Sequence, residues 1–418
     1  MNEARREEGA ARATSTRVLA LLLLVYTFDF LDRQILAILA IPLQKDLQLT
    51  NTQLGLMGGI AFASVYSTLA IPFARWADRK GRVPVIAVAV AVWSLFTALC
   101  GMAQNFSQIF LFRMGVGVGE AGGVAPSYAL IADLFPPNRR ARALAIFSLG
   151  IPIGSAVGLF FGGWLATALN WRIAFAIIGL AGLPLALLVR FFVTEAAVPA
   201  TAAAPGLAAT ATALARKPAF WLLAFAAACS SICGYGFGFW LPKYFTTYLG
   251  MPLAKVGLYF GSIVLVGGTA GIYGGGLVAD RLRRRTPLAD ALVPAAAFLL
   301  TGPLYFAAMS ITSSALAWPL FALPYMLSLV WLGPLVSAVQ RLVLPSARAT
   351  ASACFLLINN LIGIGFGTYL FGFLSDRLRG SPGEALRHAM VYGTGFYLFA
   401  ALFALLAARR LTRDTLPG

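Results

Sequence analysis

The stretch ARWADRKGR, residues 74–82, closes the second of a series of long apolar segments, and GGLVADRLRRR, residues 275–285, closes the eighth. Asp78 and Asp280 occupy the same place in the two stretches, and basic residues follow each of them. The repeat divides the chain into two halves of six apolar segments. Two repeated halves joined by a polar connection are the architecture of many membrane carriers.

The apolar segments are long enough to cross a bilayer, which requires about 20 residues of helix. Hydrophobic residues make up 60% of the 418 residues and charged residues only 11%, whereas a soluble domain carries about 25% charged residues. We therefore expect an all-α integral membrane protein with about twelve transmembrane helices in two pseudo-symmetric six-helix bundles. The expected helices lie near 17–43, 52–77, 83–103, 107–134, 142–168, 172–193, 219–247, 253–279, 288–309, 315–342, 347–374 and 386–408.

The two bundles are expected at residues 1–193 and 219–418, with a cytoplasmic linker at 194–218. The linker is rich in small residues and contains proline, which is typical of a connecting segment, and a short helix is expected near 207–216. The polar start of the chain has no cleavable signal pattern, so the first apolar segment should remain as a helix.

Lysine and arginine indicate the orientation of the chain. If the N-terminus is cytoplasmic, 23 of the 32 basic residues fall on the cytoplasmic side and 7 on the other. This bias follows the positive-inside rule, and it accounts for the net charge of +17 without a nucleic-acid partner. We expect a multi-pass protein of the cell inner membrane with both termini cytoplasmic.

Five charged residues interrupt the apolar segments near their middle, and all five are in the first half. They are Asp29, Asp32, Arg33, Arg113 and Glu120. Charges within a membrane are costly and are candidates for function. The second half has none at comparable depth, since its Lys243, Lys255 and His388 are expected near the outer rim.

The spacing of these charged residues suggests which side chains could contact each other. Asp29 and Arg33 are i,i+4 and can pair. Arg113 and Glu120 are two turns apart on one stripe of their helix, so one long side chain could almost reach the other. Three acids and two arginines leave an excess negative charge, so one carboxylate should take up a proton readily. Glu120 or Asp32 is the expected proton-coupling residue. The alternative is that the five residues only neutralise one another and fix helix packing.

A family resemblance rests on several of these motifs. Residues 74–82 resemble the helix 2–3 signature of the major facilitator superfamily, Gly-x-x-x-Asp-Arg-x-Gly-Arg, with Ala74 in place of the first glycine. Gly276 keeps that glycine in the second half, and NWRIAF at 170–175 and FRMGVGVGEA at 112–121 are further marks. Together these motifs cover nearly the whole chain.

Within this superfamily, FDFLDRQ at 28–34 and GVGEAG at 117–122 resemble the Spinster-like group, which includes carriers of sphingosine-1-phosphate and lysophospholipids. The resemblance implies Asp32 and Glu120 as the protonation pair and Arg33 as their switchable partner. Either Arg33 or Arg113 could also hold an anionic headgroup, because guanidinium suits phosphate and carboxylate.

The resemblance also implies a cytoplasmic latch that favours one of two states. Its expected members are Asp78, Arg79, Gly81, Arg82, Asp133, Asp280 and Arg281. The alternative is that these charges act only as topology signals. The second half should shape an aromatic and apolar side of the substrate cavity, from Tyr235, Trp240, Tyr259, Tyr325, Trp331, Asn359 and Asn360.

Three glycines recur at regular spacing in the expected helix at 142–168. Gly150, Gly154 and Gly158 have the i+4 spacing that permits close helix contact, although an antiport-specific role is an alternative. No metal site or cofactor is expected, because the four cysteines lie in apolar helices without a nearby ligand set.

We therefore predict a proton-coupled secondary transporter that works by alternating access, as a monomer in the lipid bilayer. Its expected substrate is a small amphipathic or lipid-like anion of the lysophospholipid or sphingoid phosphate type. The alternative within the superfamily is a multidrug or organic-anion transporter. A membrane-embedded enzyme is a remote alternative, since no catalytic cluster accompanies the single His388, and we expect no enzyme activity.

Overall fold

The computed structural model describes residues 2–193, 207–311, 314–344 and 347–414, and helices with short connections make up these residues. Eleven helical stretches are long and apolar enough to cross a membrane. The expected fold class is confirmed. The eleven stretches are Thr14–Leu47, Asn51–Lys80, Arg82–Cys100, Arg142–Ala168, Trp171–Phe192, Pro218–Thr247, Leu253–Arg283, Ala289–Met309, Ala317–Gln340, Thr350–Arg377 and Pro382–Leu411.

The fourth expected span, 107–134, is a broken helix. It consists of α5 (Phe106–Ala121) and α6 (Val124–Leu134), separated at Gly122 and Gly123. Consecutive glycines interrupt a helix because each one is about 1 kcal/mol less favourable there than alanine. With 16 and 11 residues, neither piece reaches the ~20 residues that a span requires, and together they fill the expected range.

The described residues form two compact units, each with its own packing. Unit 1 contains the described residues within Met1–Leu47 and Ser64–Thr201. Unit 2 contains the described residues within Gln48–Ala63 and Ala202–Gly418. The division differs from the one expected from sequence, because the start of the second span belongs to unit 2. Residues 194–206 of the expected linker lie outside the described residues, whereas its expected short helix is present as α10 (Leu207–Ala215).

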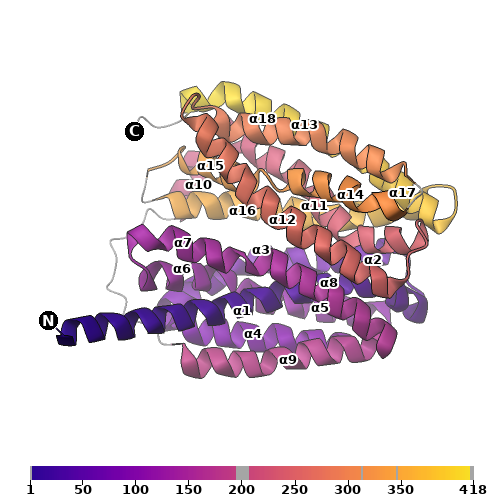
Figure 1. Cartoon of the computed structure of the whole chain (residues 1–418), viewed down its shortest axis with the longest axis horizontal. Coiled ribbons are helices and arrows are strands. Elements are labelled where there is room, and N and C mark those ends of the chain that lie inside the picture. The colour runs from indigo at the N-terminus through magenta and orange to yellow at the C-terminus, as the bar shows by residue number, and fades with distance from the viewer. Residues whose placement is uncertain (1, 194–206, 312–313, 345–346, 415–418) are drawn as a thin grey trace. The chain divides into compact units, whose positions relative to one another are not determined.

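In unit 1, α8 packs along α1, and α4 packs against α5 and α9 (Figure 1). We call the end of the unit where α1 begins its terminal end, and the other its far end. The remaining helices of the unit are α1 (Asn2–Leu47), α3 (Ile60–Lys80, from Ser64), α4 (Arg82–Cys100), α7 (Pro137–Ser148), α8 (Gly150–Ala168) and α9 (Trp171–Phe192).

In unit 2, α11 packs against α16 and α18, and α13 packs against α18 (Figure 1). Its terminal end is the one where α18 ends near the C-terminus, and its far end is opposite. Its helices, besides α10, are α2 (Asn51–Gly58), α11 (Pro218–Thr247), α12 (Leu253–Arg283), α13 (Ala289–Met309), α14 (Ser314–Ser328), α15 (Leu332–Gln340), α16 (Arg348–Arg377), α17 (Pro382–Gly393) and α18 (Gly395–Asp414).

The glycines of α8 are packing residues. A Cβ atom on Gly154 would lie 2.2 Å from the carbonyl oxygen of Thr27, and one on Gly158 would lie 2.5 Å from that of Leu31. Gly150 likewise faces Tyr26 of α1. Glycine therefore lets the two backbones touch, as the small-residue spacing predicts.

We predict that Gly154→Ala destabilises the protein by about 1–3 kcal/mol, the usual effect of overpacking. Thermal unfolding of the purified protein in detergent measures the effect. Gly274→Ala in α12 is the matched control, because a Cβ there meets no atom within 4 Å. Equal melting temperatures for the two variants would contradict the close α1–α8 contact.

Candidate functional site

Arg33 of α1 joins two buried carboxylates. Its Nε donates to Oε2 of Glu120 in α5 at 2.7 Å, and its Nη2 lies 3.3 Å from both carboxylate oxygens of Asp29. Asp29 is 2% exposed and Glu120 is 1% exposed. The i,i+4 pairing of Asp29 with Arg33 is confirmed, and the contact with Glu120 ties α1 to α5.

Two aromatic rings complete the surroundings of Arg33. The rings of Phe30 and Tyr66 each have their centroid 4.8 Å from its guanidinium carbon. A ring face attracts a cation, and more strongly where water is scarce. Tyr66, on α3, carries no charge and is distant in sequence, so the search for charged residues within apolar segments missed it.

Asp32 and Arg113 form a second buried pair. Arg113 Nη1 lies 3.5 Å from Asp32 Oδ2, and Thr97 of α4 donates its hydroxyl to Asp32 Oδ1 at 2.7 Å. Although Arg113 and Glu120 share one stripe of their helix, each of them pairs with a residue of α1. Seven residues along a helix span about 10.5 Å, and the partners on α1 are closer.

The buried network has more acid than base. Among the residues that the structure describes, Asp29, Asp32 and Glu120 form ion pairs with Arg33 and Arg113, which leaves one excess negative charge if all five are ionised. Several of its atoms also have no hydrogen-bond partner among the described residues, namely Asp32 Oδ2, Glu120 Oε1 and Arg113 Nε and Nη1. A proton on one of the three carboxylates would remove the excess charge.

The terminal end of unit 1 carries an ion pair between Arg82, at the start of α4, and Asp133, near the end of α6. Both residues are members of the expected latch, and the structure pairs them with each other. Gly81 precedes α4 with φ of +94°, a conformation that side chains disfavour, and this explains the glycine of the motif. Asp78 and Arg79 are exposed residues in the last turn of α3.

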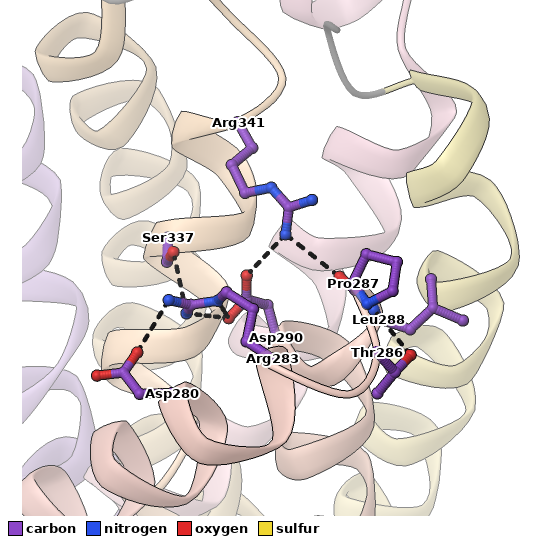
Figure 2. Close-up of polar contacts among 8 residues, drawn as sticks. All are labelled: Asp280, Arg283, Thr286, Pro287, Leu288, Asp290, Ser337 and Arg341. Carbon is purple, nitrogen blue, oxygen red and sulfur yellow. Dashed lines mark hydrogen bonds and ion pairs between the residues drawn. The ribbon is translucent and has the colours of Figure 1, made fainter. Parts of the chain in front are cut away.

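The terminal end of unit 2 carries a larger cluster around Asp290, which is fully buried at the start of α13 (Figure 2). Arg283 contacts one oxygen of Asp290, and Arg341 Nη1 lies 3.2 Å from the other. Arg283 also pairs with Asp280 at 2.9 Å. The basic partner of Asp280 is therefore Arg283, one helical turn further. Arg281, which was expected in the latch, is exposed.

Sequence reasoning missed Asp290, Arg283 and Arg341 because it followed the repeated motif and stopped at its first arginine. One signal was present in the chain. Asp290 is an acid in the first turn of an apolar helix, where a carboxylate is favoured by the helix dipole but needs a partner if it is buried.

The far end of unit 2 has a polar clamp, by which we mean the contacts of Asn51 and Thr52 with Ser375, Asp376 and Lys243. Asp376 of α16 accepts from the backbone N–H of Asn51 at 3.1 Å and of Thr52 at 2.7 Å, and from the Thr52 hydroxyl at 2.6 Å. Asn51 donates its amide to Ser375 at 3.1 Å. These contacts cap the start of α2.

Lys243 of α11 completes the clamp by donating to the side-chain oxygen of Asn51. It is 4% exposed, and its expected place near the outer rim stays a prediction. Behind the clamp, a Cβ on Gly59 would lie 2.1 Å from Thr368 Oγ1 and one on Gly55 would lie 2.5 Å from the Thr368 carbonyl oxygen. The α2 helix thus fits against α16 without space for a methyl group.

The expected cavity residues of unit 2 differ in exposure. Trp240 is fully buried and donates its indole N–H to the Thr368 carbonyl at 2.8 Å, so it packs against α16. Asn359 is buried too, between Ser231 and Asn360. Trp331 is 5% exposed and contacts Phe355. The half-buried members are Tyr235, Tyr259, Tyr325 and Asn360.

A helical membrane protein with repeated end motifs and a buried charge network has the features of a secondary transporter. The chain belongs to the Major Facilitator Superfamily, whose family model matches residues 22–368. No group of three histidine, cysteine or acidic residues that could hold a metal ion occurs in the described part of the chain.

Relatives place the chain within this superfamily. It is 35% identical over 397 residues to an MFS-type efflux pump of Mycolicibacterium smegmatis, covering 94% of this chain and 92% of that protein. It is 30% identical over 400 residues to protein spinster homolog 1 of Mus musculus, covering 89% and 75%.

A solved structure gives the same result. A bacterial homolog of the human lysosomal transporter Spinster, in an inward-facing and unoccupied conformation, matches with a TM-score of 0.87 at 28% identity, covering 97% of this chain and 99% of that one. The resemblance to the Spinster-like group is therefore confirmed, and the protein is a transporter related to Spinster and to a bacterial efflux pump.

We predict that Arg33→Ala lowers the free energy of unfolding by about 3–5 kcal/mol, because it leaves two buried carboxylates without their partner. Thermal unfolding in detergent at neutral pH measures the loss. Adding Glu120→Gln to Arg33→Ala should restore much of the stability, since it removes one of the two unpaired charges. A double variant no more stable than the single one would show that the loss comes from packing.

Proposed function

We propose that the protein is a proton-coupled transporter in which Glu120 and Asp32 are the protonation sites. The observation that carries the proposal is the Arg33–Glu120 contact of 2.7 Å within a network that holds three acids and two arginines. An unbalanced charge in a low-dielectric site is costly, so the network favours the binding of one proton.

The proton acts through Arg33. Once Glu120 is protonated, its attraction for Arg33 weakens, and the guanidinium keeps only Asp29, on its own helix, as a charged partner. The α1–α5 connection then loosens, and Arg33 becomes available for another anion. Deprotonation of Glu120 draws Arg33 back, so one proton biases the equilibrium between two states of the carrier.

We propose an amphipathic, lipid-like anion as the substrate, of the lysophospholipid or sphingoid phosphate type. The motifs shared with the Spinster-like group support this class, as does a guanidinium that can bind phosphate through two parallel hydrogen bonds. The half-buried tyrosines of unit 2 offer apolar surface for a hydrocarbon chain.

The second candidate is export of amphipathic drugs or organic anions. It is favoured by the 35% identity, over 94% of the chain, to a protein described as an MFS-type efflux pump. The same proton step serves both candidates, because it depends on the network and not on the cargo. Competition between labelled lysophospholipid and cationic or anionic drugs distinguishes the two.

We further propose a monomer in the cell inner membrane with both termini cytoplasmic. The bias of 23 basic residues to 7 supports this orientation. In this frame the polar clamp of α2 is at the outer face, and the Arg82–Asp133 pair and the Asp290 cluster are at the inner face. Alternating access then requires contacts at one face to open as those at the other close.

We predict that Glu120→Gln abolishes the response of transport to an imposed pH gradient in proteoliposomes loaded with labelled lysophospholipid. Transport by the variant should fall to the rate that the wild type shows without a gradient. Glu384→Gln is the matched control, because Glu384 is an exposed residue of a capping box, a role that glutamine can fill. A Glu120→Gln variant that keeps full gradient-driven transport would exclude Glu120 as the coupling residue.

We predict that tying α2 to α16 arrests transport. In Thr52→Cys/Asp376→Cys, a short bifunctional thiol reagent should link the two positions, whose side chains are in hydrogen-bond contact in the wild type. Uptake should stop on linking and return when a cleavable linker is reduced. The Thr52→Cys variant with the same reagent controls for the native cysteines. Undiminished transport by the linked protein would show that the clamp does not open.

A further inference from the structure

A groove opens at the terminal end of unit 2, between α11 and α18 and beside the end of α10. Its volume is about 730 Å³, within the range of roughly 300–1,000 Å³ that is usual for ligand clefts. No part of the transport site contributes to it. Its lining combines three aromatic residues with three arginines and contains no acidic residue.

The aromatic wall is continuous and faces outward. The Trp221 ring stacks with that of Phe225 at 6.0 Å, and Phe225 in turn lies 6.0 Å from Phe403 of α18. Trp221 is 39% exposed and Phe225 is 38% exposed. The Trp221 indole N–H donates to the carbonyl of Ala215 at 3.0 Å, which fixes the ring against the end of α10.

The three arginines of the groove are Arg216, Arg409 and Arg410, and all are exposed. None of them takes part in the ion pairs found among the described residues. The acid nearest in sequence, Asp414, is already engaged, since its Oδ2 accepts from the backbone N–H of Ala219 at 2.9 Å. The groove therefore carries concentrated positive charge.

The groove lies at the level where a membrane changes from polar to apolar. The span of α11 begins at Pro218, and the span that includes α18 ends at Leu411. Arg216, Arg409 and Arg410 are thus within about one turn of the span ends, while Trp221, Phe225 and Phe403 are further into the spans. Tryptophan is enriched at this interface because its ring is apolar and its N–H is polar.

We propose that this groove binds one anionic diacyl phospholipid of the bilayer. The phosphate contacts the three arginines, and the acyl chains lie along the wall of Trp221, Phe225 and Phe403. Guanidinium groups suit phosphate oxygens through paired hydrogen bonds, and basic pockets between membrane helices recognise anionic headgroups. The bound lipid connects α10 with α11 and α18, and so fastens the end of the linker to unit 2.

Arginines near the ends of spans also serve as topology signals, and the same unit offers a comparison. Arg284 and Arg285 are exposed at its terminal end as well, but they do not line the groove. If charge alone attracted anionic lipid, the two pairs of arginines would be equivalent. Arg409 and Arg410 differ from Arg284 and Arg285, because they lie beside the aromatic wall of the groove.

Native mass spectrometry of the full chain in detergent tests the proposal, with phosphatidylglycerol and phosphatidylcholine of identical acyl chains as probes. The wild type should retain one phosphatidylglycerol in preference to phosphatidylcholine. Arg409→Gln/Arg410→Gln should weaken that binding roughly tenfold or more, as expected for two lost headgroup contacts. Arg284→Gln/Arg285→Gln, with the same change of charge, should leave it unchanged.

Thermal unfolding provides a second measurement. Phosphatidylglycerol should raise the melting temperature of the wild type, of the Arg284→Gln/Arg285→Gln control and of Arg409→Lys/Arg410→Lys, but not that of Arg409→Gln/Arg410→Gln. Equal loss of lipid by the two glutamine double variants would overturn the proposal in favour of general charge attraction. Equal retention of the two lipids by the wild type would overturn the preference for an anionic headgroup.

Discussion

The cost of placing charge inside a membrane is the constraint on which this structure depends. Arg33 is the main response to it in unit 1, since one guanidinium serves Asp29, Glu120 and two aromatic rings at once. Asp29 and Phe30 are on α1 with Arg33, whereas Tyr66 is on α3 and Glu120 is on α5, so these contacts also fix the positions of α1, α3 and α5. Chemistry and architecture are therefore coupled, because the ion pair with Glu120 also holds α1 against α5.

An ion pair lies at the terminal end of each unit, and the positions of the acid and the base are exchanged between the two units. In unit 1 the base is on the third span of the half and the acid on the fourth, as Arg82 and Asp133. In unit 2 the acid, Asp290, is on the third span and the base, Arg341, follows the fourth. The repeat has thus conserved the position of an ion pair while exchanging its signs. Pairing is the requirement, and either helix can supply the charge.

Sequence alone predicted the fold well because hydrophobic length reports membrane spans directly, and the expected segments agree closely with the helices found. The Asp29–Arg33 pair followed from spacing, and the motif indicated Arg82 and Asp133 as latch residues without assigning them to each other. The partners of Glu120 and Arg113 did not follow from spacing, because contacts between helices depend on rotation about each axis, which no single-helix pattern records. Tyr66 and Thr97 were missed because they carry no charge, and Asp290 because it lies beyond the repeated motif. The break at Gly122 and Gly123 was visible as two glycines, but glycine is too common in membrane helices to mark a break.

The clamp on α2 has a consequence for how the protein is made. Asp376 is 325 residues beyond Asn51 in the chain, so at 5–20 residues per second the ribosome needs roughly 15–65 s to supply the partner. Until then the first backbone N–H groups of α2 have only water and lipid headgroups to bond at the membrane surface. The second span is therefore synthesised early, but the start of its helix gains its last hydrogen-bond partner late. In a chain stalled before its eleventh span, that end of the helix would remain accessible to quality-control proteases.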